Sequence, residues 1–333
     1  MRAIVCDRAG GPEVLRLVET DPREPGPGEV RVRVHVSGVN PTDWKSRSGT
    51  DPGWQQVPDQ DGAGVVDAVG EGSGFAPGER VWVWEAAYRR PDGTAQELAV
   101  VPADRVVPLP HAASFDLGAA LGVPALTAHL ALRSADPAPL PLAPGALTGR
   151  TVLVAGGAGA VGHATIELAA WAGARVISTV SSAAKAALAR AAGAHEVVDY
   201  RAEDATARIS DLAPDGVDLV VEVNPVANAG LDAEVLAPHG SIAVYATDTP
   251  DPLSFPVRPF MTKNLRWRFL LLYTASTAEK DAAVAGVRAA VAAGALRVGE
   301  EAGLPLTRFP LERTADAHAA VEGGTVGKVL VDV

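Results

Sequence analysis

Residues 152–163 read VLVAGGAGAVGH, a pattern typical of a strand, a glycine-rich turn and the start of a helix. A short apolar run leads into glycines with the spacing G-x-G-x-x-G, and an alanine-rich segment follows. In a dinucleotide-binding unit the first glycine allows a tight turn, the second lets a pyrophosphate approach the backbone, and the third lets helix and strand pack closely. The helix N-terminus offers free N–H groups and a positive dipole end to the phosphates. The stretch therefore predicts a strand, a helix, and between them a nucleotide-binding loop at Gly157, Gly159 and Gly162.

The segments after residue 151 alternate between strand-like and helix-like patterns. The runs TVLVAG, ARVISTV, HEVVDY, VDLVVEV and GSIAVYA read as strands, whereas AVGHATIELAAWAG and SAAKAALARAAG read as helices. Continuous apolar strands that alternate with helices form a parallel sheet covered on both faces. We expect an α/β fold here, with a doubly wound parallel sheet.

The first 110 residues read instead as strands separated by turns. In residues 29–39, EVRVRVHVSGV, valines alternate with Arg31, Arg33 and His35, which predicts a strand with one buried face and one wet face. GAGVVDAVGEG and GERVWVWEAAY are expected to behave in the same way. Together they indicate a β-rich, partly open, barrel-like antiparallel domain.

Three further segments organise the chain. Residues 116–135 are helical in composition, with Pro124 expected to mark a break. The proline-rich residues 136–145 read as a stiff surface connection. The final alternating stretch, GKVLVDV, is expected to rejoin the first domain.

The composition excludes several classes of function. The formal charge is −11 and the basic residues form no run, so duplex nucleic acid is a poor partner, because phosphate binding needs a clustered positive surface. The single cysteine, Cys6, excludes a disulfide framework and a zinc site built from cysteines. No apolar signal region opens the sequence, and no uncharged apolar stretch reaches membrane-spanning length. We expect a soluble cytoplasmic protein that binds neither membranes nor nucleic acid.

The second strand of the predicted α/β domain bears on the choice between NAD and NADP. An NAD site usually has an acidic side chain there, but no acidic residue occurs between Glu167 and Glu196. Ser181, Ser182 and Lys185 follow the strand instead, and hydroxyls and an ammonium attract the 2′-phosphate of NADPH. The alternative for Lys185 is a solvated position on an alanine-rich helix.

Several catalytic motifs are absent from the sequence. There is no Tyr-x-x-x-Lys pair, no G-x-S-x-G turn and no H-E-x-x-H pair. The sequence thus indicates a nicotinamide site without an evident metal or proton donor. A quinone or an activated alkene suits such a site, because its reduced oxygen is stable without a Lewis acid.

The motifs GPEVLRL, PGPGEVRVRVHVSGVNPTDWKSRSG, DGAGVVDAVGEGSGFAPGERV, VLVAGGAGAVG and AHAAVEGGTVGKVLVDV resemble the medium-chain dehydrogenase/reductase superfamily, in its zinc-free quinone oxidoreductase (ζ-crystallin-like) branch. Zinc-dependent members carry Cys where this chain has Asn40, and Gly-His-Glu where it has DQDGAG. The resemblance implies a GroES-like catalytic domain over residues 1–124 and 274–333, and a Rossmann NADPH-binding domain over residues 125–273. It implies no metal.

The resemblance also assigns roles to individual residues. Asn40 and Asp43 are implied as catalytic, with Asn40 holding the substrate carbonyl; a loop-capping turn is the alternative for Asn40 and Pro41. The substrate pocket is expected to include Trp44, Trp54 and Gln60. Backbone N–H groups of Ala158, Gly159, Ala160 and Val161 are implied to hold the pyrophosphate. The remaining expected cofactor-binding residues are Thr127, Lys185, Tyr200, Asn224, Tyr245, Ala246, Thr247 and Lys328.

Two more features belong to the comparison with this branch. No tyrosine occurs between residues 40 and 60, where enoyl-thioester reductases of the superfamily carry a proposed proton donor. Residues 258–273, RPFMTKNLRWRFLLLY, resemble the edge strand through which family members form dimers, so a homodimer is expected.

These observations predict an NADPH-dependent reductase that moves hydride to a quinone or a related α,β-unsaturated carbonyl without a metal. Two alternatives stay open. One is an enoyl or 2-alkenal reductase, and the other is an NADPH-binding protein with a structural or sensing role and little turnover.

Overall fold

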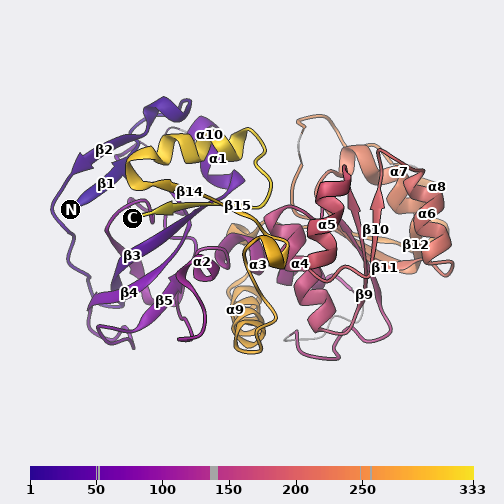
Figure 1. The fold of residues 1–333 in the computed structure, drawn as a ribbon, viewed down its shortest axis with the longest axis horizontal. Helices are drawn as coiled ribbons and strands as arrows, with labels where there is room; N and C mark the ends of the chain where they lie inside the picture. The colour runs from indigo at the N-terminus through magenta and orange to yellow at the C-terminus, as the bar shows by residue number, and fades with distance from the viewer. Residues whose placement is uncertain (50, 52, 136–141, 248, 256) are drawn as a thin grey trace. The chain divides into compact units, whose positions relative to one another are not determined.

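The computed structural model describes residues 1–49, 51, 53–135, 142–247, 249–255 and 257–333. The chain forms two compact units (Figure 1). Unit 1 comprises residues 1–123 and 305–333, and unit 2 comprises residues 124–304. Within the proline-rich connection expected at 136–145, residues 136–141 lie outside the described residues.

The chain returns to unit 1 later than the sequence suggested. Residues 274–304, expected in the first domain, lie in unit 2. The reason is the packing of helix α9 (Thr277–Ala292) on helix α3 (Gly122–Leu132): a Cβ at Gly286 would lie 2.4 Å from Nε2 of His129. The Arg268 guanidinium also contacts the Glu279 carboxylate at 2.6 Å. This ion pair connects α9 to the strand β13 (Arg266–Phe269) of unit 2.

Unit 2 contains the predicted parallel sheet. Its six strands, in spatial order, are β10 (Glu196–Asp199), β9 (Arg175–Val180), β8 (Thr151–Ala155), β11 (Val217–Glu222), β12 (Leu236–Val244) and β13 (Arg266–Phe269). Every neighbouring pair is parallel. The doubly wound α/β prediction is confirmed.

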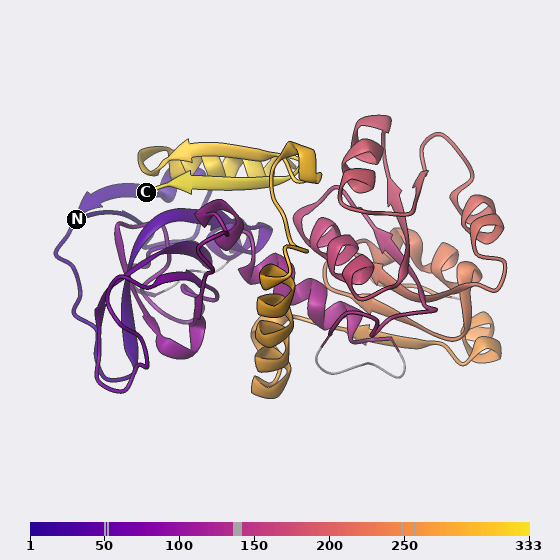
Figure 2. The ribbon, with the colours of Figure 1, turned by 60° about the horizontal axis from the view of Figure 1, so that its bottom comes forward.

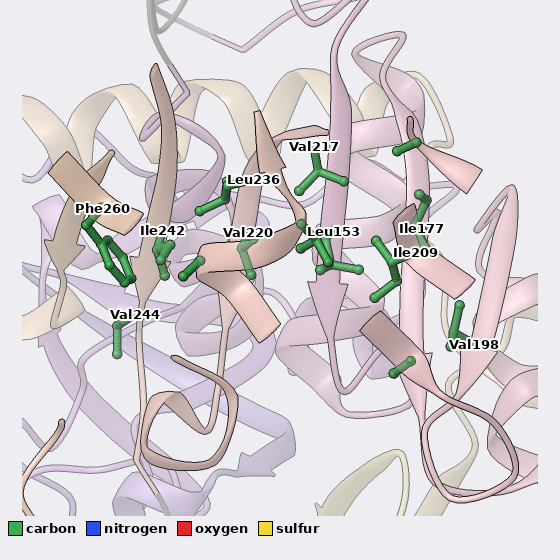
Figure 3. Packing of buried hydrophobic residues seen from close by; sticks show 14 residues of the cluster. Leu153, Ile177, Val198, Ile209, Val217, Val220, Leu236, Ile242, Val244 and Phe260 are labelled. Atoms are coloured by element: carbon green, nitrogen blue, oxygen red, sulfur yellow. The ribbon is translucent and has the colours of Figure 1, made fainter. Parts of the chain in front are cut away.

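Helices cover both faces of this sheet. They are α3, α4 (Ala160–Trp171), α5 (Ala183–Ala191), α6 (Ala205–Leu212), α7 (Pro225–Val235), α8 (Val257–Lys263) and α9. Figure 3 shows the core on one face, where Leu153, Val220 and Ile242 of three neighbouring strands pack with side chains from α6, α7 and α8. Val152 and Val154, also buried, point to the opposite face, because successive side chains of a strand alternate.

Unit 1 is built mainly of antiparallel strands. A path of strands runs β14 (Leu306–Pro310), β15 (Lys328–Asp332), β3 (Glu29–Val39), β4 (Asp61–Val69), β5 (Arg80–Val83) and β7 (Val106–Pro108), and β6 (Leu98–Pro102) pairs with β3. Only β14 and β15 pair in parallel among these. In the described part of the chain this path does not close into a barrel, which fits the predicted partly open GroES-like domain.

Smaller elements complete unit 1. Strands β1 (Arg2–Val5) and β2 (Arg16–Glu19) form a separate antiparallel pair. Helix α10 (Thr314–Glu322) packs on β14 and β15 (Figure 2). The helices of this unit are α1 (Pro41–Gly49), α2 (Phe115–Gly118) and α10 (Thr314–Glu322).

The alternating pattern holds for β3 but not for the next two strands. In β3 the valines are buried, while Arg33 and His35 are exposed, as predicted. Residues of β5 are buried in succession, and the first four residues of β4 are too, so the prediction of one wet face is wrong there. Helix α2 covers the second face: a Cβ at Gly118 would lie 2.6 Å from Cβ of Ala63 and 3.4 Å from Cβ of Trp82.

The predicted break at Pro124 is also wrong. Pro124 lies in the first turn of α3, and the interruption falls earlier, between α2 and α3. Proline is tolerated in a first turn because the N–H that it lacks would have no helical acceptor there.

None of the helices in the described ranges is long and apolar enough to cross a membrane.

Titration of His129 in α3 should produce a pH dependence of stability. Among the described residues, neither ring nitrogen of His129 has a hydrogen-bond partner. Burial, and then the Arg133 guanidinium, lower the pKa of His129 from 6.5 to about 4. Between these values the unfolded chain binds a proton that the folded chain excludes, so the free energy of unfolding falls as the pH drops, by up to about 3 kcal/mol.

We expect His129→Leu to flatten this part of the profile when urea unfolding is followed between pH 4 and 7. His111 is exposed, so His111→Gln is the matched control and should keep the wild-type slope. An unchanged slope in His129→Leu would show that another group titrates.

Candidate functional site

The carboxyl ends of the parallel strands in unit 2 bring the predicted nucleotide residues to one edge. Gly156 follows β8, Ser181 follows β9, Tyr200 follows β10, and Tyr245 follows β12. Asn224 lies two residues beyond β11. Because parallel strands end at the same edge, these residues share it, and ligands of open α/β sheets bind at this edge.

The glycines of the loop have distinct structural roles. The turn itself is at Gly156, which has φ +71°, and not at Gly157 as expected. Gly157 is needed for close packing on β9, because a Cβ there would lie 2.0 Å from Oγ of Ser178. Gly162 lets α4 approach the loop, since its Cβ would lie 2.4 Å from the Gly156 carbonyl oxygen. At Gly159 the nearest such atom is 3.5 Å away, so space over the backbone is open.

The N-terminus of α4 fits the pyrophosphate of a dinucleotide. Gly159 is the N-cap and supplies no side-chain hydrogen bond, and the His163 N–H is the first that bonds back into the helix, to the Gly159 carbonyl at 2.8 Å. The N–H groups before it have no acceptor within the helix by helical geometry. They belong to Ala160, Val161 and Gly162, and together with the open space at Gly159 they form a cradle for an anion.

The end of β9 gathers a cation and hydroxyl groups. The Lys185 ammonium donates to Oγ of Ser181 at 3.0 Å, and Oγ of Ser182 accepts the Lys185 N–H at 3.3 Å as the N-cap of α5. Tyr200 lies beside them, since its N–H donates to the Val180 carbonyl at 3.1 Å, and it is 51% exposed. The structure thus groups four of the predicted cofactor residues.

Two cavities open at this end of unit 2. One of about 230 Å³ is lined by Gly156, Tyr200, Asn224 and Asp232, among others. Two of the side chains that line this cavity, Glu222 and Asp232, are buried carboxyl groups. Burial, followed by the charge of Glu222, raises the pKa of Asp232 well above its usual range. A second cavity of about 540 Å³ is lined by apolar side chains together with Tyr245, Ala246 and Thr247.

Thr127 is not gathered with the other predicted cofactor residues. It lies in the interior of α3 and is buried. Neither of these two cavities is lined by it.

Unit 1 contains a buried polar cluster. Its members come from β3, α1, the segment before β4, β4 itself, the loop before β6, α10 and β15, and each is less than a tenth exposed. They are Ser37, Asn40, Asp43, Asp59, Asp61, Thr94, His318 and Lys328. The sequence analysis singled out only Asn40, Asp43 and Lys328.

The Asn40 carboxamide is hydrogen-bonded on every side. Oδ1 accepts from the Lys328 ammonium at 2.6 Å. Nδ2 donates to Oδ2 of Asp61 at 2.8 Å and to the Gly38 carbonyl at 3.2 Å. Both amide protons are therefore engaged, and the contact with Gly38 is the longer of the two.

Asp43 stabilises the start of α1. Its Oδ2 accepts the Asn40 N–H at 2.7 Å, the arrangement by which an acidic N3 residue caps a helix. Burial, and then the charges of Asp59 and Asp61, raise the pKa of Asp43 well above its usual range.

Asp59 pairs with His318, and no local pattern in the sequence indicates this contact. Oδ1 of Asp59 lies 2.8 Å from Nε2 of His318, and its Oδ2 accepts from the Ser37 hydroxyl at 3.0 Å. The backbone of Asp59 has φ +74°, a strained value for a residue other than glycine. Asp59 and His318 are separated by 259 positions, so only the fold brings them together.

The expected substrate-pocket residues lie in different surroundings. Trp54 is 49% exposed, Trp44 is partly buried, and Gln60 is buried beside Asp43 at a cavity of about 30 Å³. Within the described ranges, no cluster of three or more His, Cys, Asp or Glu side chains could hold a metal ion.

Two families match the sequence: the alcohol dehydrogenase GroES-like domain at residues 26–111 and zinc-binding dehydrogenase at residues 160–298. The quinone oxidoreductase of Rattus norvegicus is 33% identical over 99% of this chain and 97% of its own length. The chain belongs to the quinone oxidoreductase family of the medium-chain dehydrogenase/reductase superfamily.

Solved structures agree with this family. An NAD-dependent alcohol dehydrogenase is 30% identical with a TM-score of 0.85, and the quinone oxidoreductase of Escherichia coli, complexed with NADPH, is 26% identical with a TM-score of 0.83. Both matches cover the whole of each chain. The chain is therefore an oxidoreductase of the medium-chain dehydrogenase/reductase superfamily.

Two glycines of the nucleotide loop should fail in different ways when changed to alanine. Gly157→Ala would press Cβ against Ser178 and Ile166, so we expect a loss of about 1–3 kcal/mol in the free energy of unfolding. Gly159→Ala should change stability by less than about 0.5 kcal/mol, because its Cβ has room. It should instead weaken dinucleotide binding, because the methyl group stands where the pyrophosphate approaches.

Urea unfolding and a fluorescence titration with the dinucleotide measure the two effects separately. Gly159→Ala is the matched control for stability. Equal destabilisation of both variants, or unaltered binding by Gly159→Ala, would contradict these roles.

Proposed function

We propose that the chain is an NADPH-dependent oxidoreductase that transfers hydride to a quinone or a related α,β-unsaturated carbonyl without a metal ion. The observation that carries the proposal is the group at the end of β9, where the Lys185 ammonium, Ser181 and Ser182 lie together. In a dinucleotide fold this position meets the adenosine ribose. An ammonium and hydroxyls favour the 2′-phosphate that distinguishes NADPH from NADH.

Two of the solved structures similar to this chain have different cofactors. The Escherichia coli quinone oxidoreductase was solved with NADPH, whereas the alcohol dehydrogenase is NAD-dependent. The residues of this chain therefore have to decide, and Lys185 with Ser181 favours NADPH.

Each part of the edge has a proposed task. The first N–H groups of α4 bind the pyrophosphate, Lys185 and Ser181 bind the 2′-phosphate, and Tyr245–Thr247 line the pocket for the nicotinamide. NADPH supplies the hydride when it is bound, and one proton from solvent completes the reduction of a quinone to a hydroquinone. The sequence has a single cysteine, and the described residues contain no group of three or more His, Cys, Asp or Glu side chains that could hold a metal ion, which supports chemistry without a metal.

In unit 1 we propose that Asn40 is the residue that binds the acceptor carbonyl. The amide N–H held by Gly38 at 3.2 Å is the one it can give up for this contact. Asp43 acts through Asn40 as a positioning residue, because it holds the Asn40 backbone N–H. Trp44, Trp54 and Gln60 stay a prediction as substrate-pocket residues, and Thr127 stays one as a cofactor residue.

A panel of acceptors tests the proposed reaction. NADPH absorbance is followed with a benzoquinone, a naphthoquinone, a 2-alkenal and an enoyl thioester. We expect the quinones to be reduced fastest. Faster reduction of the alkenal or the thioester would favour an alkene reductase, and tight NADPH binding without turnover of any acceptor would favour a binding protein.

Lys185→Ala tests the choice of cofactor. We expect about a tenfold loss of NADPH affinity or more, because one charge-assisted hydrogen bond to a phosphate is removed, and little change for NADH. Arg190→Ala is the matched control, since Arg190 is an exposed cation on the same helix. A stronger affinity of the wild type for NADH, or an unchanged NADPH affinity in Lys185→Ala, would contradict the proposal.

We also propose that unit 2 pairs with a second copy of the chain at β13. This strand lies at the end of the sheet. Phe269, its last residue, is 64% exposed, and Leu271, two residues beyond it, is 55% exposed. An apolar edge strand favours pairing with another edge, and two-fold pairing of identical edges closes a dimer.

Leu271→Glu should convert the dimer to a monomer, because a charge would be buried against the partner strand. Light scattering after size-exclusion chromatography measures the mass. Leu17→Glu, at a 44% exposed leucine of β2, is the control and should leave the dimer intact. A monomeric wild type, or a dimer that persists in Leu271→Glu, would contradict the pairing.

A further inference from the structure

Lys328 is a lysine buried among oxygen atoms of unit 1. Its side chain is 1% exposed, and its ammonium donates to Oδ1 of Asn40 at 2.6 Å and to the Val39 carbonyl at 3.1 Å. Oδ2 of Asp61 lies 3.9 Å away. Burying an ammonium group costs free energy unless hydrogen-bond acceptors surround it, and the oxygens of Asn40 and Val39 are the acceptors here.

The glycine at position 38 leaves room for the Lys328 side chain. A Cβ at Gly38 would lie 2.0 Å from the Ala119 carbonyl oxygen and 3.1 Å from Cε of Lys328. Any side chain at position 38 would therefore displace the aliphatic part of Lys328 or the backbone of Ala119, the residue that follows helix α2. The glycine keeps the path to Asn40 open for Lys328.

The partners of Asn40 leave only one orientation for its carboxamide. An ammonium can only donate, so the amide oxygen has to face Lys328. An ionised carboxylate can only accept, so the amide nitrogen has to face Asp61, at 2.8 Å. A flipped amide would set donor against donor and acceptor against acceptor.

We infer that Lys328 is a positioning residue for Asn40, and not a residue that binds the cofactor. Its ammonium holds Oδ1, so that Nδ2 presents its second N–H, the one on Gly38, to the acceptor carbonyl. A hydrogen bond accepted at the amide oxygen also polarises the amide and strengthens its N–H groups as donors. The inference rests on the proposed role of Asn40 in binding the acceptor.

The charge of Asp61 makes this orientation depend on pH. Burial raises the pKa of Asp61 to about 6, against the opposing effects of Lys328, of the Asn40 amide and of the Val123 N–H. The charged and titratable groups that face it are Lys328 from β15, Asp43 from α1 and Asp59.

His318 from α10 contacts Asp59, and not Asp61, through its Nε2 atom. Above its pKa the Asp61 carboxylate can only accept, whereas the protonated form can donate and no longer forces the amide. Removal of the Lys328 charge should raise the pKa of Asp61 further, because the opposing charge is lost.

Nuclear magnetic resonance of the side-chain amides of the full chain tests the inference without turnover. The Asn40 signal is assigned by its loss in Asn40→Asp. In the wild type we expect the Asn40 Nδ2 protons to titrate with a midpoint near pH 6. In Lys328→Met the midpoint should rise by about one pH unit or more, and the protons should exchange faster with water.

Lys263→Met is the matched control for the loss of a lysine. Its ammonium donates to three carbonyls of unit 2, and its removal should leave the Asn40 signal unchanged. If Lys328→Met does not fold, the wild-type titration decides alone: an Asn40 signal that ignores pH between 5 and 8 overturns the inference.

Kinetics separate positioning from cofactor binding. We expect Lys328→Met to keep NADPH affinity within about twofold, to lower kcat about tenfold or more, and to move the acid limb of the pH profile upward. A loss of NADPH affinity with kcat unchanged would overturn the inference. If the wild type reduces no acceptor, the proposed function fails, and the resonance experiment still decides the role of Lys328.

Discussion

The close approach of helix α4 to the first two strands of unit 2 is the constraint on which the nucleotide site depends. Gly157 lies against Ser178 of β9, and Gly162 lies against the carbonyl of Gly156, at separations that no side chain would allow. This approach aims the first N–H groups of α4 at the carboxyl edge of the sheet. The parallel register of the neighbouring strands then places Lys185, Ser181 and Tyr200 along the same edge.

A different constraint organises unit 1. The register of the antiparallel strands sets Val329 opposite Val39, and Gly38 opposite Asp61. Three chain segments that are far apart in sequence therefore deliver Lys328, Asn40 and Asp61 to one buried point. Because these side chains are buried, water cannot satisfy their hydrogen bonds, so each polar group needs its neighbours as hydrogen-bond partners.

The parts of the fold that follow from periodicity could be predicted from the sequence. The glycine loop, the parallel strands after residue 151 and the alternating strand β3 were all recognisable, because local patterns of apolar residues report burial directly. The double burial of β5, the position of the break before α3 and the extent of unit 2 were not, because each depends on a helix that packs from elsewhere in the chain. The left-handed turn at Gly156 was not predicted, because the pattern G-x-G-x-x-G begins at the next residue, Gly157.

The candidate site shows the same division. Ser181, Ser182 and Lys185 follow the strand after the glycine loop, about 20 residues further along the chain, so they could be found by counting from the loop. Asp59 and His318 could not, since nothing local links two positions 259 residues apart. Lys328 was predicted as a cofactor-binding residue, and its contacts with Asn40 and Asp61 could not be predicted, because they depend on the pairing of β15 with β3.

We propose that NADPH lies along the carboxyl edge of the unit 2 sheet, with its 2′-phosphate at the end of β9. A crystal structure of the full chain with NADPH would test this placement. We expect the pyrophosphate on the N–H groups of Ala160, Val161 and Gly162, and the 2′-phosphate within hydrogen-bond distance of Lys185 and Ser181. Electron density that places the 2′-phosphate away from Lys185, or the dinucleotide away from this edge, would contradict it.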